Sequence, residues 1–314
     1  MPQNKVQFQK GLKMTDFLAQ FGTEQKCEAE LERIRFHHGF KCLKCAHNEC
    51  YVYYHGTNKT FRCKKCNIET ILKSGTIFQG SKLPFFIWFY AIYLLTQSKN
   101  NVSALELTRT LGICYRSAWR LKHKLTKVMT EREDKRILSG RIEVDDAYLG
   151  GEHRGGKVGR GSENKVPFVA AVQTTADGRP EYVVYSNLRA FTNEIVEQWA
   201  KKILAPGSVV VSDGLACFAA VVGAGCEHEQ HVVGQGNRST DLPCFSWVNT
   251  LLGNLKTAMK GTYHSFNYSK YSKRYLAESQ YRFNRRMDMK SMFIRLLYAA
   301  AQTTARPERW LRSA

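Results

Sequence analysis

Two Cys-x-x-Cys pairs constrain the fold of this chain more than any other sequence feature. The pairs are Cys42 with Cys45 and Cys63 with Cys66. Each pair can direct two thiolates at one tetrahedral ion, and residues 46–62 between the pairs suit a β-hairpin. This spacing predicts a zinc ribbon in which four thiolates bind a structural Zn²⁺. His47 and Cys50 lie nearby and are alternative ligands.

The remaining cysteines suggest a reducing environment. The N-terminus carries no signal-peptide core, so we expect a cytoplasmic protein whose cysteines are thiols rather than disulfides. We expect core thiols at Cys27, Cys114, Cys217, Cys226 and Cys244. No apolar run reaches the roughly 18–20 residues that a membrane span needs, so we expect no membrane partner.

The charge of the chain is strongly positive and unevenly distributed. Lys and Arg number 47 against 27 Asp and Glu, which gives a net charge of +20. Residues 1–140 carry 24 − 11 = +13, residues 141–258 carry 11 − 13 = −2, and residues 259–314 carry 12 − 3 = +9. Such an excess is typical of a protein that binds a polyanion. We therefore expect the two basic flanks to bind DNA and the acidic centre to bind metal.

The periodicity of apolar residues changes near residue 141. Residues 83–135 have the three-to-four spacing of helices, and a short helical pattern lies near residues 15–21. Beyond this point, strands are predicted near 142–149, 166–175, 181–187, 208–212 and 229–233. Helices are predicted near 191–203, 214–221, 245–258 and 268–302. Strands followed by alternating strands and helices predict an α/β fold.

The segment from Ser103 to Leu121 has the form of a helix-turn-helix. Gly112 permits the turn, and the apolar residues expected in the core are Leu105, Leu107, Leu111, Ile113, Ala118 and Leu121. The side chains predicted to point outward, where such a second helix enters the major groove, are Tyr115, Arg116, Arg120 and Lys122. An ordinary helical hairpin with a solvated basic face is the alternative.

Two aspartates end strand-like runs. Asp145 follows Arg141–Val144, and Asp213 follows Ser208–Ser212. A carboxylate at the tip of a buried strand is costly unless it binds a cation or another partner. In so basic a protein, two of them predict divalent metal beside a nucleic-acid backbone. Glu143 shares the strand face of Asp145 and is a supporting group or distant ligand, whereas Asp146 is expected to face the other way and cap the turn.

A two-metal site for phosphoryl transfer needs a third oxygen ligand, commonly from a later helix. The helix predicted near 245–258 contains no acid. Asn249 and Lys256 are two turns apart and share one face, so Asn249 could ligate a cation and Lys256 could bind a phosphate. Asn254 and Glu278 are alternatives for the third ligand.

Together these segments resemble the DDE-type transposases of bacterial insertion sequences, which have an RNase H-like fold. Within that group the chain is similar to the branch with an N-terminal zinc ribbon and a DDNK pattern. The matching stretches are Cys42–Cys66, Glu143–Gly151, Val209–Gly214, Trp247–Thr250, Lys256, Gly261–His264, Arg274–Glu278 and Arg282–Arg286. The resemblance implies catalytic positions at Asp145, Asp213, Asn249 and Lys256, with Mg²⁺ or Mn²⁺ at the two aspartates. We also expect DNA contacts from His264, Arg282, Arg285 and Arg286.

The domain organisation expected from the pattern and the resemblance has five parts. They are an N-terminal helical segment (1–26), a zinc ribbon (27–75), a helix-turn-helix domain (83–135), an RNase H-like catalytic core (141–258) and a basic helical segment (259–314).

The resemblance implies DNA transposition. Terminal inverted repeats are recognised, an element end is hydrolysed with the help of metal, and the 3′-OH is transferred to target DNA. We expect a homodimer or higher oligomer on DNA at the nucleoid, because joining two ends needs two active sites. The alternatives are a zinc-dependent DNA-binding regulator, which leaves the aspartates unexplained, and a structure-selective nuclease that cuts without joining. An inactive copy is a further alternative.

Overall fold

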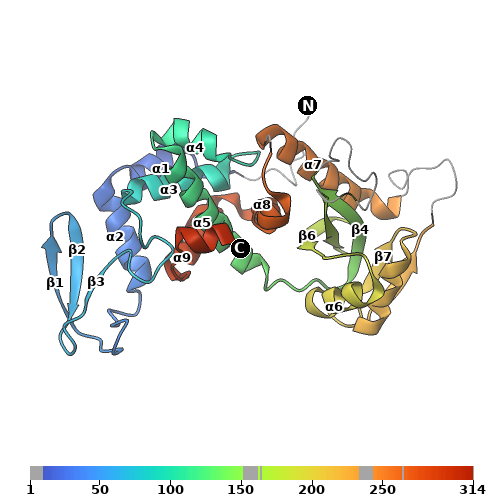
Figure 1. The fold of residues 1–314 in the computed structure, drawn as a ribbon, viewed down its shortest axis with the longest axis horizontal. Helices are drawn as coiled ribbons and strands as arrows, with labels where there is room; N and C mark the ends of the chain where they lie inside the picture. The colour runs from blue at the N-terminus through green and yellow to red at the C-terminus, as the bar shows by residue number, and fades with distance from the viewer. Residues whose placement is uncertain (1–9, 151–161, 163–164, 233–242, 264, 314) are drawn as a thin grey trace. The chain divides into compact units, whose positions relative to one another are not determined.

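The computed structural model of the protein describes residues 10–150, 162, 165–232, 243–263 and 265–313 (Figure 1). The chain forms two compact units: Met1–Val128 with Met287–Ala314, and Met129–Arg286. Among the described residues, no helix combines the length and apolar character that crossing a membrane would require.

The zinc-ribbon sheet of the first unit has three antiparallel strands in the order β1 (Cys50–His55), β2 (Asn58–Cys63) and β3 (Glu69–Ile71). It follows two helices, α1 (Met14–Phe21) and α2 (Glu24–Arg35). The sequence analysis did not predict α2. Its N-cap is Thr23, whose side chain accepts a hydrogen bond from the Lys26 N–H, and its buried face is Cys27, Leu31 and Ile34.

Helices make up the rest of the first unit. They are α3 (Phe85–Gln97), α4 (Ala104–Leu111), α5 (Tyr115–Glu133), α9 (Met289–Gln302) and α10 (Glu308–Ser313). Aromatic packing joins the N- and C-terminal segments, because the Phe293 ring of α9 lies 5.5 Å from Phe17 and 6.0 Å from Phe89 between centroids. The last turn of α5, from Met129, belongs to the second unit.

Helices α4 and α5, joined by a turn at Gly112, form where the sequence predicts them, and their role as a DNA-binding helix-turn-helix stays a prediction. Ser103 caps α4 by accepting from the Glu106 N–H, and Gly112 ends it at φ 64°, a left-handed conformation that glycine adopts without steric cost. Leu107 and Leu111 are buried as predicted. The prediction for Leu105 is wrong, since its side chain is 48% exposed. It lies two residues from Leu107, and residues two apart do not share a helix face.

The second unit is built on a five-stranded sheet in the order β6-β5-β4-β7-β8. The strands are β4 (Arg141–Leu149), β5 (Val166–Thr174), β6 (Pro180–Asn187), β7 (Val209–Ser212) and β8 (Glu227–Gln230). Strands β6, β5 and β4 are antiparallel, and β7 and β8 run parallel to β4. This arrangement is RNase H-like, and the predicted fold class is confirmed.

Helices cover both faces of this sheet (Figure 1). On one face, α6 (Asn193–Ile203) and the 3₁₀ helix η1 (Ala216–Ala224) pack with Ile142 and Val144 of β4. On the other, α7 (Ser246–Thr262) and α8 (Tyr268–Phe283) pack with Ala147 and Leu149. The two faces of β4 therefore belong to different cores.

The single helix predicted over 268–302 is two helices. Residues 286–288 form the 3₁₀ turn η4, and Asp288 begins α9 by accepting from the Ser291 N–H. Before the break, the Asn284 side chain binds the backbone of β6, accepting from the Val183 N–H at 2.8 Å and donating to the Val183 carbonyl at 2.9 Å. Apolar periodicity continues across the break, so the sequence pattern alone did not indicate it.

Candidate active site and zinc centre

The four predicted zinc ligands come together in the first unit. Their sulfur atoms all lie within 4.8 Å of one another. The Cys42 and Cys66 sulfurs are 3.5 Å apart, and the Cys45 and Cys63 sulfurs are 3.6 Å apart. Sulfurs around a tetrahedral ion with Zn–S bonds of about 2.3 Å are about 3.8 Å apart, so this donor set fits Zn²⁺. Among the described residues, His47 and Cys50 are not part of this cluster.

The two cysteine pairs have the same backbone turn. The Ala46 N–H donates to the Cys42 carbonyl and the Asn67 N–H to the Cys63 carbonyl, both at 3.0 Å. Ala46 and Asn67 follow the second cysteine of their pairs and have φ values of 58° and 57°. The ribbon therefore needs a left-handed residue at two equivalent places. Asparagine tolerates that conformation better than alanine does.

Other thiols differ in part from expectation. Cys27, Cys217 and Cys226 are buried as predicted, and Cys244 is half-buried. The prediction for Cys114 is wrong, because it is exposed at the turn before α5 and its thiol donates to the Ser117 hydroxyl at 3.3 Å.

An acidic cluster lies beside β4 in the second unit, where the neighbouring strand β7 ends. Carboxylate oxygens of Asp145, Asp146 and Asp213 lie within 4.8 Å of one another. The last pair between β4 and β7 is Val144 with Ser212, so Asp145 and Asp213 are the next residues along the two strands. Asp213 follows the end of β7, but Asp145 does not end its strand as expected, because β4 continues to Leu149 in pairing with β5. The prediction that these two carboxylates meet is confirmed. Three hard oxygen donors this close fit a divalent cation.

The position of Asp146 corrects the sequence analysis, which expected it to face away and cap a turn. As expected, Asp146 lies on the strand face opposite Asp145, together with Val144 on the α6 side of the sheet. Its carboxylate nevertheless lies in the acidic cluster, and the residue itself lies within β4 rather than at a turn. Because β7 ends at Ser212, side chains from both faces of β4 can lean past its end toward Asp213. Two adjacent acids within one strand-like run were the sequence signal that could have identified Asp146.

Burial and like charge act together on Asp145. Its pKa rises from the usual 3.8 to about 7, first because it is desolvated, and then because Asp213 and Asp146 lie close. The charge of Lys256 acts in the opposite direction and lowers the pKa. Negative charge in this cluster is therefore costly until a cation neutralises it.

Helix α7 brings the other candidate residues toward this end of the sheet. Its apolar face packs on β4 and β5 through Val248, Leu251, Leu252, Leu255 and Met259. Lys256 is exposed, and its effect on Asp145 places it near the cluster. Asn249 is half-buried and shares the helix face of Lys256, whereas the exposed Asn254 projects elsewhere.

Glu143 binds the N-terminal end of α7. Its Oε2 accepts from the backbone N–H groups of Trp247 at 3.0 Å and Val248 at 2.9 Å. Its Oε1 accepts from the Arg141 guanidinium at 3.2 Å. The side chain is buried and is not part of the acidic cluster among the described residues. Its oxygens thus bind α7 and Arg141, as expected of a supporting group.

Glu278, the acid weighed as a substitute ligand, lies apart from the acidic cluster among the described residues. It is fully buried in α8 and accepts a hydrogen bond from the Tyr263 hydroxyl at 2.8 Å. The structure does not bring it together with Asp145 and Asp213.

The outward residues predicted on α5 have different surroundings. Tyr115 is 57% exposed. Arg116 and Arg120 both pair with Glu308, at 3.1 and 3.4 Å. The prediction that Lys122 points outward is wrong, because this residue is 1% exposed and its ammonium donates to the Val102 carbonyl. Arg120 precedes Lys122 by two positions, and residues two apart point to opposite sides of a helix.

The arginines predicted to contact DNA from the C-terminal segment lie in the second unit. Arg285 donates to Glu133 and to the Tyr281 carbonyl, and Arg286 donates to the carbonyls of Pro180 and Glu181. Arg282 is half-buried, and burial lowers its pKa. Arg285 and Arg286 thus bind protein groups in this structure, and DNA contact by all three stays a prediction. His264 lies outside the described residues.

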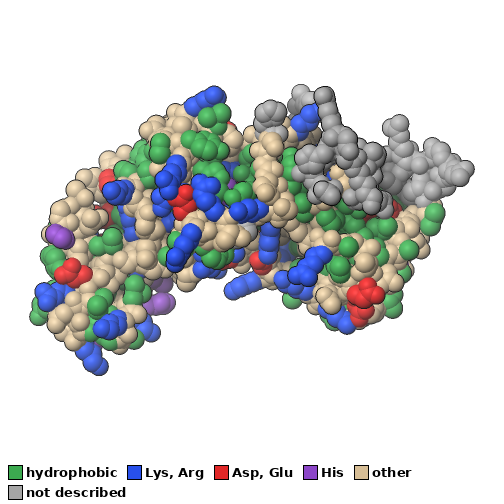
Figure 2. Space-filling model, viewed as in Figure 1, with side chains coloured by type: hydrophobic (Ala, Val, Ile, Leu, Met, Phe, Trp, Pro, Cys, Tyr) green, Lys and Arg blue, Asp and Glu red, His purple; other side chains and the backbone are tan. Residues whose placement is uncertain are grey.

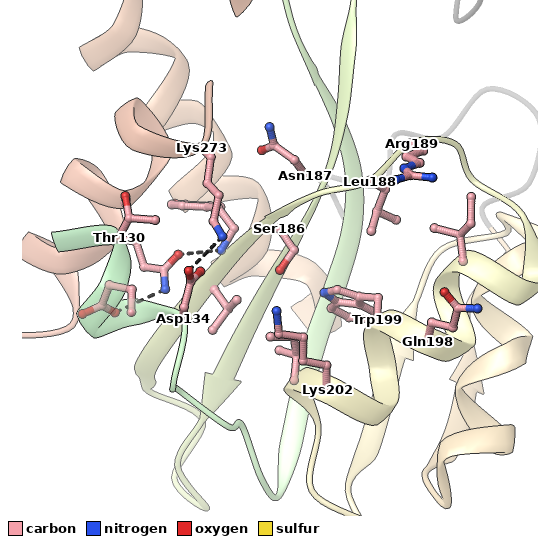
Figure 3. A pocket seen from close by; sticks show the side chains of 17 residues that line it. Thr130, Asp134, Ser186, Asn187, Leu188, Arg189, Gln198, Trp199, Lys202 and Lys273 are labelled. Atoms are coloured by element: carbon pink, nitrogen blue, oxygen red, sulfur yellow. Dashed lines mark hydrogen bonds and ion pairs between the residues drawn. The ribbon is translucent and has the colours of Figure 1, made fainter. Parts of the chain in front are cut away.

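A cavity of about 610 Å³ opens between α6, α8 and β6 in the same unit (Figure 3). Lys273 of α8 reaches across its rim to Asp134 at 2.8 Å, and the Trp199 ring forms part of its wall. None of the three aspartates of the acidic cluster lines it.

Comparison with known proteins finds one similar domain family in each unit. Residues 22–69 match the model of a transposase zinc-ribbon domain, and residues 137–284 match that of an ISXO2-like transposase domain. Over these two stretches the chain is similar to transposases, in a zinc-ribbon domain and in the domain that holds the acidic cluster. The match to the ISXO2-like transposase domain includes all three residues of the acidic cluster and the whole of α7.

Individual relatives are more distant. A protein described as an uncharacterized protein in transposable element ISH50 of Halobacterium salinarum is 25% identical over 132 residues, which are 41% of this chain and 43% of the relative. The chain thus spans less than half of that relative. A solved simian T-cell lymphotropic virus intasome, in complex with PP2A regulatory subunit B56 gamma, contains a chain with 10% identity and a TM-score of 0.28. That match covers 56% of this chain and 63% of the other.

Proposed function

We propose that the protein is a DNA transposase that hydrolyses the ends of an insertion sequence and joins the freed 3′-OH to target DNA. The observation that carries the proposal is the convergence of Asp145 and Asp146 of β4 with Asp213, which follows the end of the neighbouring parallel strand β7. Such an enzyme acts in the cytoplasm, at the nucleoid.

Asp145 and Asp213 bind Mg²⁺ or Mn²⁺ in this proposal, with Asp146 as a further carboxylate beside them. When bound, two such ions supply positive charge to the attacking and leaving oxygens of an in-line displacement. Asn249 adds a neutral oxygen ligand from α7. Lys256, on the same helix face, holds a non-bridging phosphate oxygen and thereby orients the scissile bond. Glu143 fixes the start of that helix.

The DNA partner is double-stranded and includes the terminal inverted repeats and the target. The net charge of +20 favours such a polyanion. Figure 2 shows Lys and Arg side chains gathered around α5 of the first unit. Tyr115, Arg116 and Arg120 of α5 are the candidates for contact with the repeat. Two ends are joined, so the active form is a homodimer or higher oligomer on DNA.

The test is a cleavage and strand-transfer assay with the full chain, Mn²⁺ or Mg²⁺, and a labelled duplex that ends in the repeats flanking its gene. Wild type is expected to nick the end and to produce joined strands. Asp145→Asn and Asp213→Asn should each lower both products by about 10³-fold or more, because each removes a charged ligand. Asp177→Asn is the matched control, since Asp177 is an exposed acid on the turn at the opposite end of the sheet.

Each other outcome has a definite meaning. Nicking without joined strands would replace the proposal with a nuclease. Specific binding without any cleavage, unchanged in Asp145→Asn, would replace it with a DNA-binding regulator.

A further inference from the structure

A second cavity, of about 240 Å³, lies beside the N-terminal half of α5 in the first unit. Residues 80–83, which precede α3, form one wall, and α5 forms the other. The polar side chains that line it are Ser81, Lys82, Ser117, Arg120 and Lys124. Three of the five are cations, and no acid lines the cavity among the described residues.

The deepest cation is held in place by backbone carbonyls alone. Lys124 is 2% exposed, and its ammonium donates to the carbonyls of Ile77 at 2.7 Å and Gln79 at 2.6 Å. Arg120 donates to the next carbonyl, that of Gly80, at 3.1 Å. The two side chains thus fix the loop between Ile77 and Gly80 and place their charges under the cavity.

These charges are only partly neutralised. Burial and the neighbouring Arg120 lower the pKa of Lys124 to about 8, as expected of a buried ammonium without a carboxylate partner. Trp88 also lines the cavity and is 1% exposed, and its buried indole Nε1–H has no hydrogen-bond acceptor among the described residues. Glu308 pairs with Arg120 at 3.4 Å, but among the described residues no carboxylate pairs with Lys82 or Lys124, so the cavity keeps positive charge that an anion would neutralise.

We propose that this cavity binds one backbone phosphate of duplex DNA. Lys82 and Arg120 contact the phosphate oxygens at the mouth, with Ser81 and Ser117 as hydroxyl donors. Lys124 supplies charge from below. A phosphate bound here would hold α5 in register on DNA while its exposed residues reach the bases.

Lys82 offers a clean substitution because it is exposed and its side chain makes no hydrogen bond or ion pair with the described residues. Lys82→Ala and Arg120→Ala are compared with wild type and with Lys290→Ala. That control removes the same charge from an exposed position on α9 of the same unit. Equal melting temperatures for wild type and Lys82→Ala show that the variant is folded.

Two measurements are made on the full chain. Fluorescence anisotropy of labelled duplexes, over a range of NaCl concentrations, gives DNA affinity and its salt dependence. Lys82→Ala should weaken binding equally for the terminal repeat and for unrelated sequence, and should reduce the slope of log K against log salt by about 1, the loss of one phosphate contact. Calorimetry with inorganic phosphate as the probe should show heat of binding for wild type and Lys290→Ala, and none for Lys82→Ala.

Unchanged salt slopes in both Lys82→Ala and Arg120→Ala would overturn the proposal. Phosphate binding without any effect on DNA would also overturn it, because the site would then take the free anion instead. The inference rests on the proposed DNA partner but not on catalysis. A chain that binds DNA in this way but fails to transfer strands would remove only the proposed function.

Discussion

Glu143 Oε2 lies 2.9 Å from the backbone nitrogen of Val248, and this hydrogen bond joins strand β4 to the start of α7. The same oxygen accepts from the Trp247 N–H. A carboxylate at this place satisfies backbone N–H groups that have no partner within the helix and interacts favourably with the helix dipole. The strand that carries Asp145 therefore fixes the helix that carries Asn249 and Lys256.

Glu143→Ala should lower stability and strand transfer together. Loss of hydrogen bonds between a buried charge and two N–H groups costs about 2–3 kcal/mol of unfolding free energy. At a temperature where the variant is still folded, we expect turnover to fall at least tenfold with little change in DNA affinity. Denaturant unfolding and single-turnover assays measure the two effects. Glu143→Gln, which retains one oxygen acceptor, should be intermediate, and equal losses in DNA affinity and turnover would contradict a positioning role.

The pKa of Asp145 leads to a prediction about pH and metal. In the metal-free protein its pKa is about 7 instead of the usual 3.8, so the folded state binds this proton more tightly than the unfolded state. Stability should therefore fall as pH rises from about 4 to about 7, and the penalty is complete above that window. A bound divalent cation should remove the penalty at high pH and have little effect at low pH, where protons occupy the site.

Thermal melts at about pH 5.5 and pH 8, with and without Mn²⁺, check this dependence. Asp145→Asn should flatten the pH dependence and abolish the stabilisation by Mn²⁺. Stabilisation of equal size at both pH values, or its persistence in Asp145→Asn, would show that the ion binds elsewhere.

Glu308 makes a further prediction because it holds arginines of the predicted recognition helix. Its carboxylate pairs with Arg116 at 3.1 Å, Arg120 at 3.4 Å and Arg312 at 3.0 Å. Glu308→Gln frees these cations, so DNA affinity at low salt should rise, and the salt dependence should become steeper. Anisotropy titrations measure both. Asp288→Asn, which removes an acid paired with Arg295 in the same unit, is the control and should change neither.

Sequence patterns predicted those parts of the molecule that depend on local periodicity or on fixed spacing. The strands that carry Asp145 and lead to Asp213 were predicted because β-branched runs precede each carboxylate. The cysteine cluster was predicted because few folds are compatible with its spacing. Parallel pairing of β4 with β7 then brings the two aspartates together.

Errors arose where contacts distant in sequence decide the outcome. Asp146 joins the cluster only because β7 stops at Ser212, which strand alternation does not reveal. Lys122 is buried because the Val102 carbonyl accepts its ammonium. The break after α8 follows the interaction of Asn284 with β6, and no periodicity signals that contact.

Ala46 gives a final prediction, for the zinc ribbon. Its φ of 58° lies in the left-handed region, which costs an alanine roughly 1 kcal/mol and costs a glycine almost nothing. Ala46→Gly should therefore favour the metal-bound turn and strengthen zinc binding about threefold to fivefold, less than the full cost because glycine also gains freedom in the unfolded chain. Asn67→Gly, at the equivalent place in the second pair, should change zinc affinity less, because asparagine already tolerates this conformation.

Competition with a chelator measures zinc affinity for the two variants and wild type. Equal gains in both variants would mean that glycine acts through general flexibility of the ribbon, and weaker zinc binding in Ala46→Gly would mean that the left-handed turn is not strained.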